Sequence, residues 1–282
     1  MKPVLSVFTC FSGTLASLAS TTALDVGGTQ LTVPSPAGFA VVPPEMTLLL
    51  NRLDSFVTPA NQRLLWFLDD RELAKARAGL VPEAARSLSV QCAKKDIQTL
   101  FTKSDFAKLK KMIREQNAEL IKKVEQQMPG YMDKVNKGIQ KQFDWSGELG
   151  IDGYIPVAGQ EETERSVSYP MIVKYSVKER DGRQRLGTSV VTATFLHVKG
   201  RIIFLYCNDG QNDLQWARTI SKDWASAIVA ANPSDAAIAA KESAGSGSGY
   251  NWKAVPLYVI VIGAISVVLC IVKWFNRGRT FR

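Results

Sequence analysis

Paired carboxylates are the side chains of this 282-residue sequence that could most directly do chemistry. Asp69 and Asp70 follow the apolar run at residues 63–68, and Glu161 and Glu162 lie in an acidic segment further along the chain. Two carboxyl groups held close together can act as acid and base in hydrolysis or bind Ca²⁺. The aspartates could equally cap a following helical turn, and the glutamates could belong to a solvated loop. A carboxylate-dependent hydrolase is therefore one candidate function.

Histidine and cysteine are too few for most other site chemistries. His197 is the single histidine and lies in a strand-like run, where we expect an ordinary structural role. Cys10 and Cys270 fall in apolar end segments, which leaves Cys92 and Cys207 in the central part. These two could form a disulfide in an oxidising compartment or remain two buried thiols. The sequence has no motif for zinc, phosphate or dinucleotide binding, so we predict no metal and no cofactor.

The start of the chain is typical of a secretory signal peptide. Lys2 precedes an uncharged, moderately apolar run that ends in small residues. Small residues one and three positions before the cut fit cleavage after Ala23, with Thr21, or after Ala19, with Ser17. The sequence therefore predicts that the domain after this segment is exported.

One stretch, residues 254–272, is long and apolar enough to span a bilayer. It carries no charge, and at ~1.5 Å per residue a helix over it would cover ~28 Å, close to the thickness of the hydrocarbon layer. The basic residues that follow it are Lys273, Arg277, Arg279 and Arg282. Because positive flanks stay on the cytoplasmic side, we predict a large exported domain and a cytoplasmic C-terminus.

These ends divide the chain into five parts. They are a signal peptide (1–23), an exported α+β domain (24–232), a flexible Gly/Ser/Ala-rich tether (233–252), a transmembrane helix (253–275) and a basic cytoplasmic tail (276–282). The two end segments carry much of the net charge of +9, so that charge does not indicate nucleic-acid binding. Few cysteines and the lack of a usable glycosylation sequence favour a bacterial inner (cytoplasmic) membrane, with the domain on the periplasmic side.

A helical hairpin is predicted for residues 105–143, where apolar residues recur at intervals of three, four and seven. We expect Pro129-Gly130 to separate its two helices. Basic residues dominate this region, whereas residues 143–169 are acidic and glycine-rich, as in an irregular loop. The basic face includes Lys108, Lys111, Lys122 and Lys123. It could be a solvated surface, bind anionic lipid headgroups, or pair with the acidic loop, and we predict it as the docking surface.

Strand patterns dominate the rest of the exported domain. An antiparallel meander is predicted over residues 171–177, 188–198 and 201–207, followed by an amphipathic helix at 212–231. Earlier segments predict strands at 29–33 and 63–68, a short helix at 45–56, and a half-buried strand at 88–92. The predicted fold class is α+β: a mainly antiparallel sheet with packed helices, an inserted helical hairpin and one C-terminal transmembrane helix.

Short motifs near both ends of the domain resemble PsbP/Mog1-type α/β domains. They are Leu31-Thr32-Val33-Pro34 and Pro36-Ala37-Gly38-Phe39 at the start and, later, strand 190–198, Lys199-Gly200, strand 201–207 and the terminal helix. The resemblance covers the first strand and the C-terminal meander with its helix, and the helical hairpin departs from it. It implies an adaptor or assembly-factor module more than an enzyme, and it transfers no functional residue.

We therefore expect a single-pass membrane-anchored envelope protein whose exported domain is a non-catalytic binding or assembly module near the bilayer. Its partner would be a protein or an anionic lipid surface, and not a nucleic acid. Two alternatives stay open. One is the membrane-tethered hydrolase, and the other is a structural subunit of a membrane complex. In the latter, Gly263, Ala264 and Ser266 would let the transmembrane helix pack closely against a neighbour.

Overall fold

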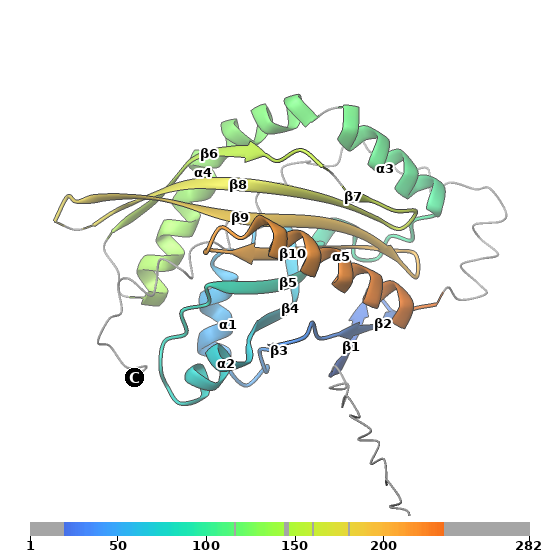
Figure 1. The fold of residues 1–282 in the computed structure, drawn as a ribbon, viewed down its shortest axis with the longest axis horizontal. Helices are drawn as coiled ribbons and strands as arrows, with labels where there is room; N and C mark the ends of the chain where they lie inside the picture. The colour runs from blue at the N-terminus through green and yellow to red at the C-terminus, as the bar shows by residue number, and fades with distance from the viewer. Residues whose placement is uncertain (1–19, 116, 144–146, 160, 180, 234–282) are drawn as a thin grey trace, which may run out of the picture.

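A large antiparallel sheet forms the centre of the molecule (Figure 1). The computed structural model describes residues 20–115, 117–143, 147–159, 161–179 and 181–233. The strands are β1 (Thr21–Val26), β2 (Thr29–Pro34), β3 (Phe39–Val41), β4 (Asn61–Asp69), β5 (Arg86–Ala93), β6 (Glu148–Pro156), β7 (Glu161–Glu162), β8 (Ser166–Lys178), β9 (Gln184–Val198) and β10 (Arg201–Asp209). The helices are α1 (Thr47–Asp54), α2 (Asp70–Arg77), α3 (Lys103–Glu115), α4 (Asn117–Phe143) and α5 (Leu214–Ala231), with a 3-10 turn η1 (Lys94–Asp96).

The sheet has eight strands in the order β3-β4-β5-β10-β9-β8-β6, with β7 also paired to β8. Every pairing in it is antiparallel. The predicted meander is confirmed as β8, β9 and β10, and α5 follows it. The predicted α+β class with a mainly antiparallel sheet is confirmed as well. Strands β1 and β2 pair only with each other and form a separate ribbon.

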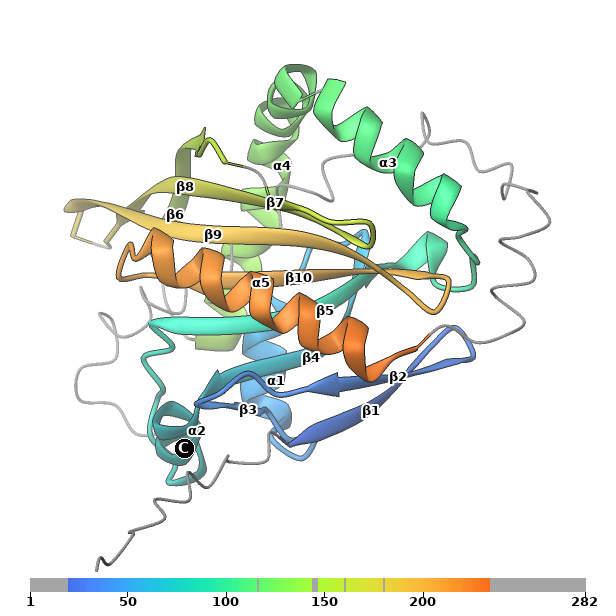
Figure 2. The same cartoon turned by 45° about the vertical axis from the view of Figure 1, so that its right-hand side comes forward.

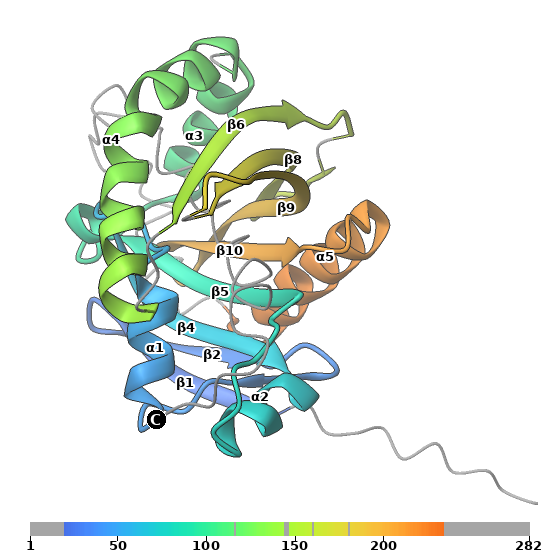
Figure 3. The ribbon, with the colours of Figure 1, turned by 90° about the vertical axis from the view of Figure 1, so that its left-hand side faces the viewer.

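Both faces of the sheet are covered (Figure 3). Helices α1, α3 and α4 pack on one face, and α5 with the β1–β2 ribbon packs on the other. Successive residues of a strand point to opposite faces, so Phe195 of β9 joins the first core and Leu196 the second. The prediction that the strand at 88–92 is half-buried is therefore wrong, because β5 is buried along nearly its whole length. Covering both faces also explains the long apolar runs of β9 and β10.

The helical region differs from its prediction at Pro129-Gly130. The predicted break there is wrong, because α3 ends at Glu115, α4 begins at Asn117, and Pro129 lies inside α4. Proline inside a helix costs about 3 kcal/mol, since it removes a backbone hydrogen bond. Burial of Met128, Tyr131 and their neighbours offsets that cost, at roughly 1.5–3 kcal/mol for each large apolar side chain. Tertiary packing thus carries the helix through a local stop signal.

The acidic segment also differs from its prediction as an irregular loop. It contains β6 and β7, both paired to β8. Gly153 follows a shift in the β6–β8 register, and such irregularities hide the alternation by which a strand is recognised. The amide of Asn136 in α4 accepts a hydrogen bond from the Leu149 N–H (2.8 Å) and donates one to the Leu149 carbonyl (2.9 Å). Tertiary pairing therefore makes this segment a strand.

The predicted anchor lies outside the described residues, as do nearly all of the predicted signal peptide and tether. Among the helices that the structure describes, none is long and apolar enough to cross a bilayer.

Candidate functional site

The inner side of α3 is joined to the segment around β7 by ion pairs. They are Lys110–Glu162 (3.1 Å), Arg114–Glu162 (2.9 Å) and Lys103–Glu164 (2.8 Å). Lys110 is buried to about nine-tenths and also donates to the Thr163 carbonyl at 2.7 Å. The hydrogen bond from Lys103 lowers the pKa of Glu164. Of the alternatives for the basic region, pairing with the acidic segment is therefore present in the fold.

The outer side of α3 presents the two predicted docking lysines of this helix. Lys108 and Lys111 are exposed, and Lys111 lies 3.7 Å from the carboxylate of Glu115 one turn later. Lys122 and Lys123 lie in α4, but their side chains are outside the described part of the chain. Phe106 of α3 is fully buried in the core, so the helix is fixed from within while its outer lysines meet solvent.

The first predicted carboxylate pair has a structural role. Asp69 caps α2 by accepting a hydrogen bond from the Arg71 N–H at 2.9 Å, and the Arg71 guanidinium lies 3.2 Å away. Burial acts to raise the pKa of Asp69, but the hydrogen bonds from Arg71 outweigh it and leave that pKa below its usual value. Asp70 occupies the first turn of α2, where a negative charge favours the helix. The capping interpretation of Asp69 is thus confirmed.

The two carboxylate pairs are far apart. Asp69 ends β4 and Glu161 begins β7, and β5, β10, β9 and β8 lie between these strands. Five strand spacings correspond to about 24 Å. Two-carboxylate hydrolysis needs the groups about 5–10 Å apart. No group of three or more potential metal-ligating side chains occurs among the described residues.

The two central cysteines form no disulfide. Cys92 and Cys207 are both free and buried. They lie on neighbouring strands, but Cys207 pairs with Leu88, four residues before Cys92, so about 13 Å of strand separates them. Of the two alternatives that the sequence left open, the structure has the two buried thiols. Burial raises the pKa of Cys92 to about 11 and that of Cys207 further.

His197 has the structural role that the sequence predicts. Its Nε2 lies 2.9 Å from the Phe101 carbonyl, and its ring stacks on Phe106 with 5.6 Å between ring centroids. The side chain is buried between β9 and α3. It therefore links the start of α3 to the sheet.

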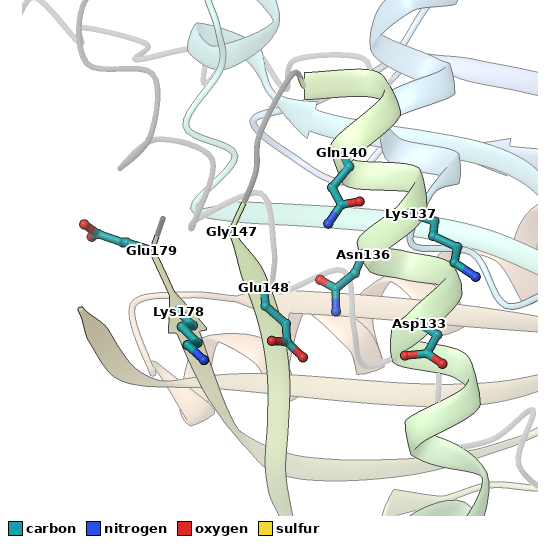
Figure 4. A pocket seen from close by; sticks show the side chains of 8 residues that line it. All are labelled: Asp133, Asn136, Lys137, Gln140, Gly147, Glu148, Lys178 and Glu179. Carbon is teal, nitrogen blue, oxygen red and sulfur yellow. The ribbon is translucent and has the colours of Figure 1, made fainter. Parts of the chain in front are cut away.

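A polar groove of about 460 Å³ lies between α4 and the adjoining ends of β6 and β8 (Figure 4). Its lining residues are Asp133, Asn136, Lys137, Gln140, Gly147, Glu148, Lys178 and Glu179. Asp133 and Asn136 of α4 point toward Glu148 of β6. The groove carries both signs of charge and no apolar side chain, so it suits a polar ligand. Sequence reasoning missed it, because only the fold brings these three elements together.

The last described residues lie at the opposite end of the domain from this groove. Asn232 follows α5 and is buried against β2. Its amide accepts from the Thr32 N–H at 2.8 Å and donates to the Thr32 carbonyl at 2.6 Å. The groove lies at the Lys178 end of β8, beside the first residues of β9, whereas Asn232 lies toward the Val198 end. Along β9 this is roughly 45 Å.

Comparison with known proteins gives a structural likeness of the expected kind. No protein-family model matches the sequence. No match is found among curated proteins. The fold is similar to the solution structure of cyanobacterial PsbP (CyanoP) from Synechocystis sp. PCC 6803, at 10% identity over 81% of this chain and 99% of that chain, with a TM-score of 0.29. A weak resemblance to PsbP-type domains is confirmed. At that TM-score it says nothing about ligands or partners.

Proposed function

We propose that this protein is a single-pass, membrane-anchored envelope protein whose exported domain binds a partner without catalysing a reaction. The sequence supports this with a signal-like start and the apolar segment at 254–272. The observation that carries it in the structure is the clamp between Asn232 and Thr32. The clamp sets the start of the chain that leads to the anchor at one end of the domain, and α3 and α4, on the other face of the sheet from α5, stay available to a partner.

A binding function also fits the placement of the reactive side chains. About 24 Å between the carboxylate pairs is too far for a two-carboxylate mechanism that takes one acid from each pair. Asp69 caps a helix, and Glu162 forms ion pairs with Lys110 and Arg114. These acids therefore stabilise the fold.

The docking surface that we propose is the outer side of α3, with Lys108 and Lys111, together with Lys122 and Lys123 of α4. Core packing and the ion pairs to Glu162 hold α3 from within. Its outer lysines are thus presented from a rigid support, which lowers the entropy lost when a partner binds. An acidic protein surface is the partner that this charge favours.

Crosslinking in intact membranes tests the docking surface. The full chain would carry K108E and K111E, and the matched control would carry K134E and K141E, two exposed lysines of α4. We expect the main crosslinked partner to be recovered at least fivefold less with the first pair and unchanged with the control. Equal recovery from both variants would remove the docking surface from α3.

Membrane anchoring is tested separately by extraction and protease treatment. We expect the full chain to stay in the membrane pellet at alkaline pH. In spheroplasts, added protease should remove the domain and leave a tag at the C-terminus intact. Loss of the C-terminal tag under these conditions would contradict the proposed topology.

A further inference from the structure

We infer that the end of the domain at which α5 stops lies against the anionic headgroups of the membrane that anchors the chain. We call this end the proximal surface and define it by Lys94, Lys95, Leu100 and Lys199. Figure 2 shows the last turn of α5, the β1–β2 turn and the β9–β10 turn at this same end. The inference rests on the proposed membrane anchoring and adds a lipid contact to it.

A buried arginine makes the proximal surface rigid. The guanidinium of Arg201 donates to Thr29 Oγ1 (2.9 Å), the Ile97 carbonyl (3.1 Å) and the Thr99 carbonyl (3.0 Å). It also donates to the carbonyl of Gly27. One side chain thus joins the β1–β2 turn, the segment after η1 and the start of β10. The backbone from which the surface side chains of these turns extend is therefore held in place.

Basic side chains extend from these joined segments toward solvent. Lys94 and Lys95 are exposed in η1, directly after β5. Lys199 begins the two-residue turn between β9 and β10 with a φ of +45°, and Gly200 continues it with a φ of +71°. Such a turn prefers Asn, Asp or Gly at its first position, because the backbone there has a positive φ. A lysine at this position is therefore unfavourable for the backbone. Leu100 is 37% exposed nearby and gives the surface one apolar side chain.

Basic side chains outnumber the acidic groups of this end. Asp25 accepts from the Gly28 N–H and from the Gln30 amide, each at 3.0 Å. Glu164 pairs with Lys103 at 2.8 Å. Asp96 is half-buried beside the exposed lysines of η1. Lys94, Lys95 and Lys199, with Arg201 beneath them, outnumber Asp25 and Asp96, so the net charge of this end is positive, as an anionic lipid surface requires.

The position of the chain exit decides which occupant this surface meets. Lys199 Nζ lies 3.3 Å from the Gln30 carbonyl, and Gln30 is two residues from Thr32, to which Asn232 is clamped. Two strand residues span about 7 Å, so the exit lies beside the lysines. A chain that runs from Asn232 to a membrane anchor brings these lysines toward the headgroups. A surface at the groove end, about 45 Å away, has no such tie.

Lysine footprinting of the full chain in lipid nanodiscs tests the inference. One set of discs contains phosphatidylcholine alone, and the other contains about one third phosphatidylglycerol. An amine-acetylating reagent labels the lysines, and mass spectrometry gives the rate at each position. We expect labelling of Lys94, Lys95 and Lys199 to be at least threefold slower in the anionic discs, with Lys141 and Lys174 unchanged. High salt should abolish the difference.

A charge-reversal variant adds a second readout. K94E with K95E should remove the protection of Lys199, whereas K137E with K141E should not. Equal labelling of the proximal lysines in both kinds of disc would overturn the inference while leaving membrane anchoring intact. Failure of the chain to enter discs of either composition would instead contradict the anchoring and, with it, the lipid contact.

Discussion

Asn232 and Thr32, 200 residues apart in the chain, exchange two hydrogen bonds through the side-chain amide of Asn232 and the backbone of Thr32. The same amide donates to the Ile228 carbonyl at 2.7 Å and so also satisfies the end of α5. Asn232 is 1% exposed, which means that water cannot replace these partners. This one side chain holds the last described helix to the first ribbon.

Replacing Asn232 with alanine should therefore lower the free energy of unfolding by about 2–4 kcal/mol. The change leaves the Thr32 N–H and carbonyl without their hydrogen-bond partner. Each buried polar group that loses its hydrogen bond costs about 1–3 kcal/mol. Urea unfolding of N232A measures the loss. The matched control is N51A, at an exposed position of α1, which should change the free energy of unfolding by less than about 0.5 kcal/mol. A loss in N232A no larger than in N51A would contradict this role for the clamp.

The ion pairs of Glu162 should stabilise the fold more than the exposed ion pair of Glu115. E162Q leaves Lys110, which is largely buried, without its nearby negative charge. We expect a loss of about 1–3 kcal/mol, between the values typical of exposed and buried pairs. E115Q removes an exposed pair with Lys111 and should cost less than about 0.5 kcal/mol. Unfolding in low and high salt measures both variants. Similar values for the two would show that α3 does not depend on Glu162.

The meander and its helix could be predicted because their patterns are local. Residues 188–198 are β-branched and apolar, and a Lys-Gly turn separates them from residues 201–207, so turn and strand signals agree. The break at Pro129 was predicted wrongly, because a local stop signal cannot show how many large side chains the same turn buries. β6 was missed since its glycines and register shift hide the alternation until β8 is in place.

The candidate site, too, could be predicted only in part from local patterns of residues. Opposite charge on the helical region and the acidic segment favours their contact, and the fold realises it through Glu162. The rotation of α3 about its axis decides which of its basic residues meet Glu162. It buries Lys110 and turns the exposed Arg114 toward Glu162, whereas Lys108 and Lys111 face solvent. The polar groove depends on three elements meeting, which no local pattern encodes. Residue type predicts charge pairing between segments, whereas geometry decides which residues remain for a partner.

The β1–β2 turn gives a sharp comparison between two neighbouring glycines. Both have a positive φ, +56° at Gly27 and +82° at Gly28. A Cβ at Gly27 would fall 1.9 Å from the Ile97 carbonyl oxygen, whereas a Cβ at Gly28 would meet nothing within 4 Å. G28A should therefore cost about 1 kcal/mol from the backbone alone, and G27A about 3 kcal/mol or more. Thermal or urea unfolding ranks the two variants. Equal losses would show that the contact between this turn and Ile97 is loose.

The start of β1 distinguishes the two cleavage positions of the predicted signal peptide. Cleavage after Ala23 would remove half of the six residues of β1, which pair with β2. Cleavage after Ala19 would leave the strand whole and keep Ser20, whose hydroxyl lies 2.9 Å from that of Ser35. We therefore expect the mature N-terminus to be Ser20, and mass spectrometry of the purified protein measures it. A mature chain that begins at Leu24 would show that β1 is not needed in full.

The raised pKa of the Cys92 thiol should make the free energy of unfolding depend on pH. Burial raises its pKa to about 11 in the folded protein, against 9.0 for an ordinary thiol. Below pH 9 the thiol is protonated in both states, so its contribution to stability is fully present. Between about pH 9 and 11 the unfolded chain ionises first, and the free energy of unfolding falls by about 2–3 kcal/mol in total, since a pKa difference of one contributes about 1.4 kcal/mol.

The variant C92A isolates this effect from the other groups that titrate at high pH. At pH 8 the wild type should be more stable than C92A by about 1 kcal/mol, because alanine leaves a small cavity. That difference should shrink and then reverse as pH approaches 11, since alanine does not ionise while Tyr131 and Tyr206 contribute equally to both proteins. Urea unfolding at intervals between about pH 8 and 10.5 measures it. A constant difference across this range would mean that the Cys92 thiol has an ordinary pKa, and that β5 is more open to water at this position than its burial indicates.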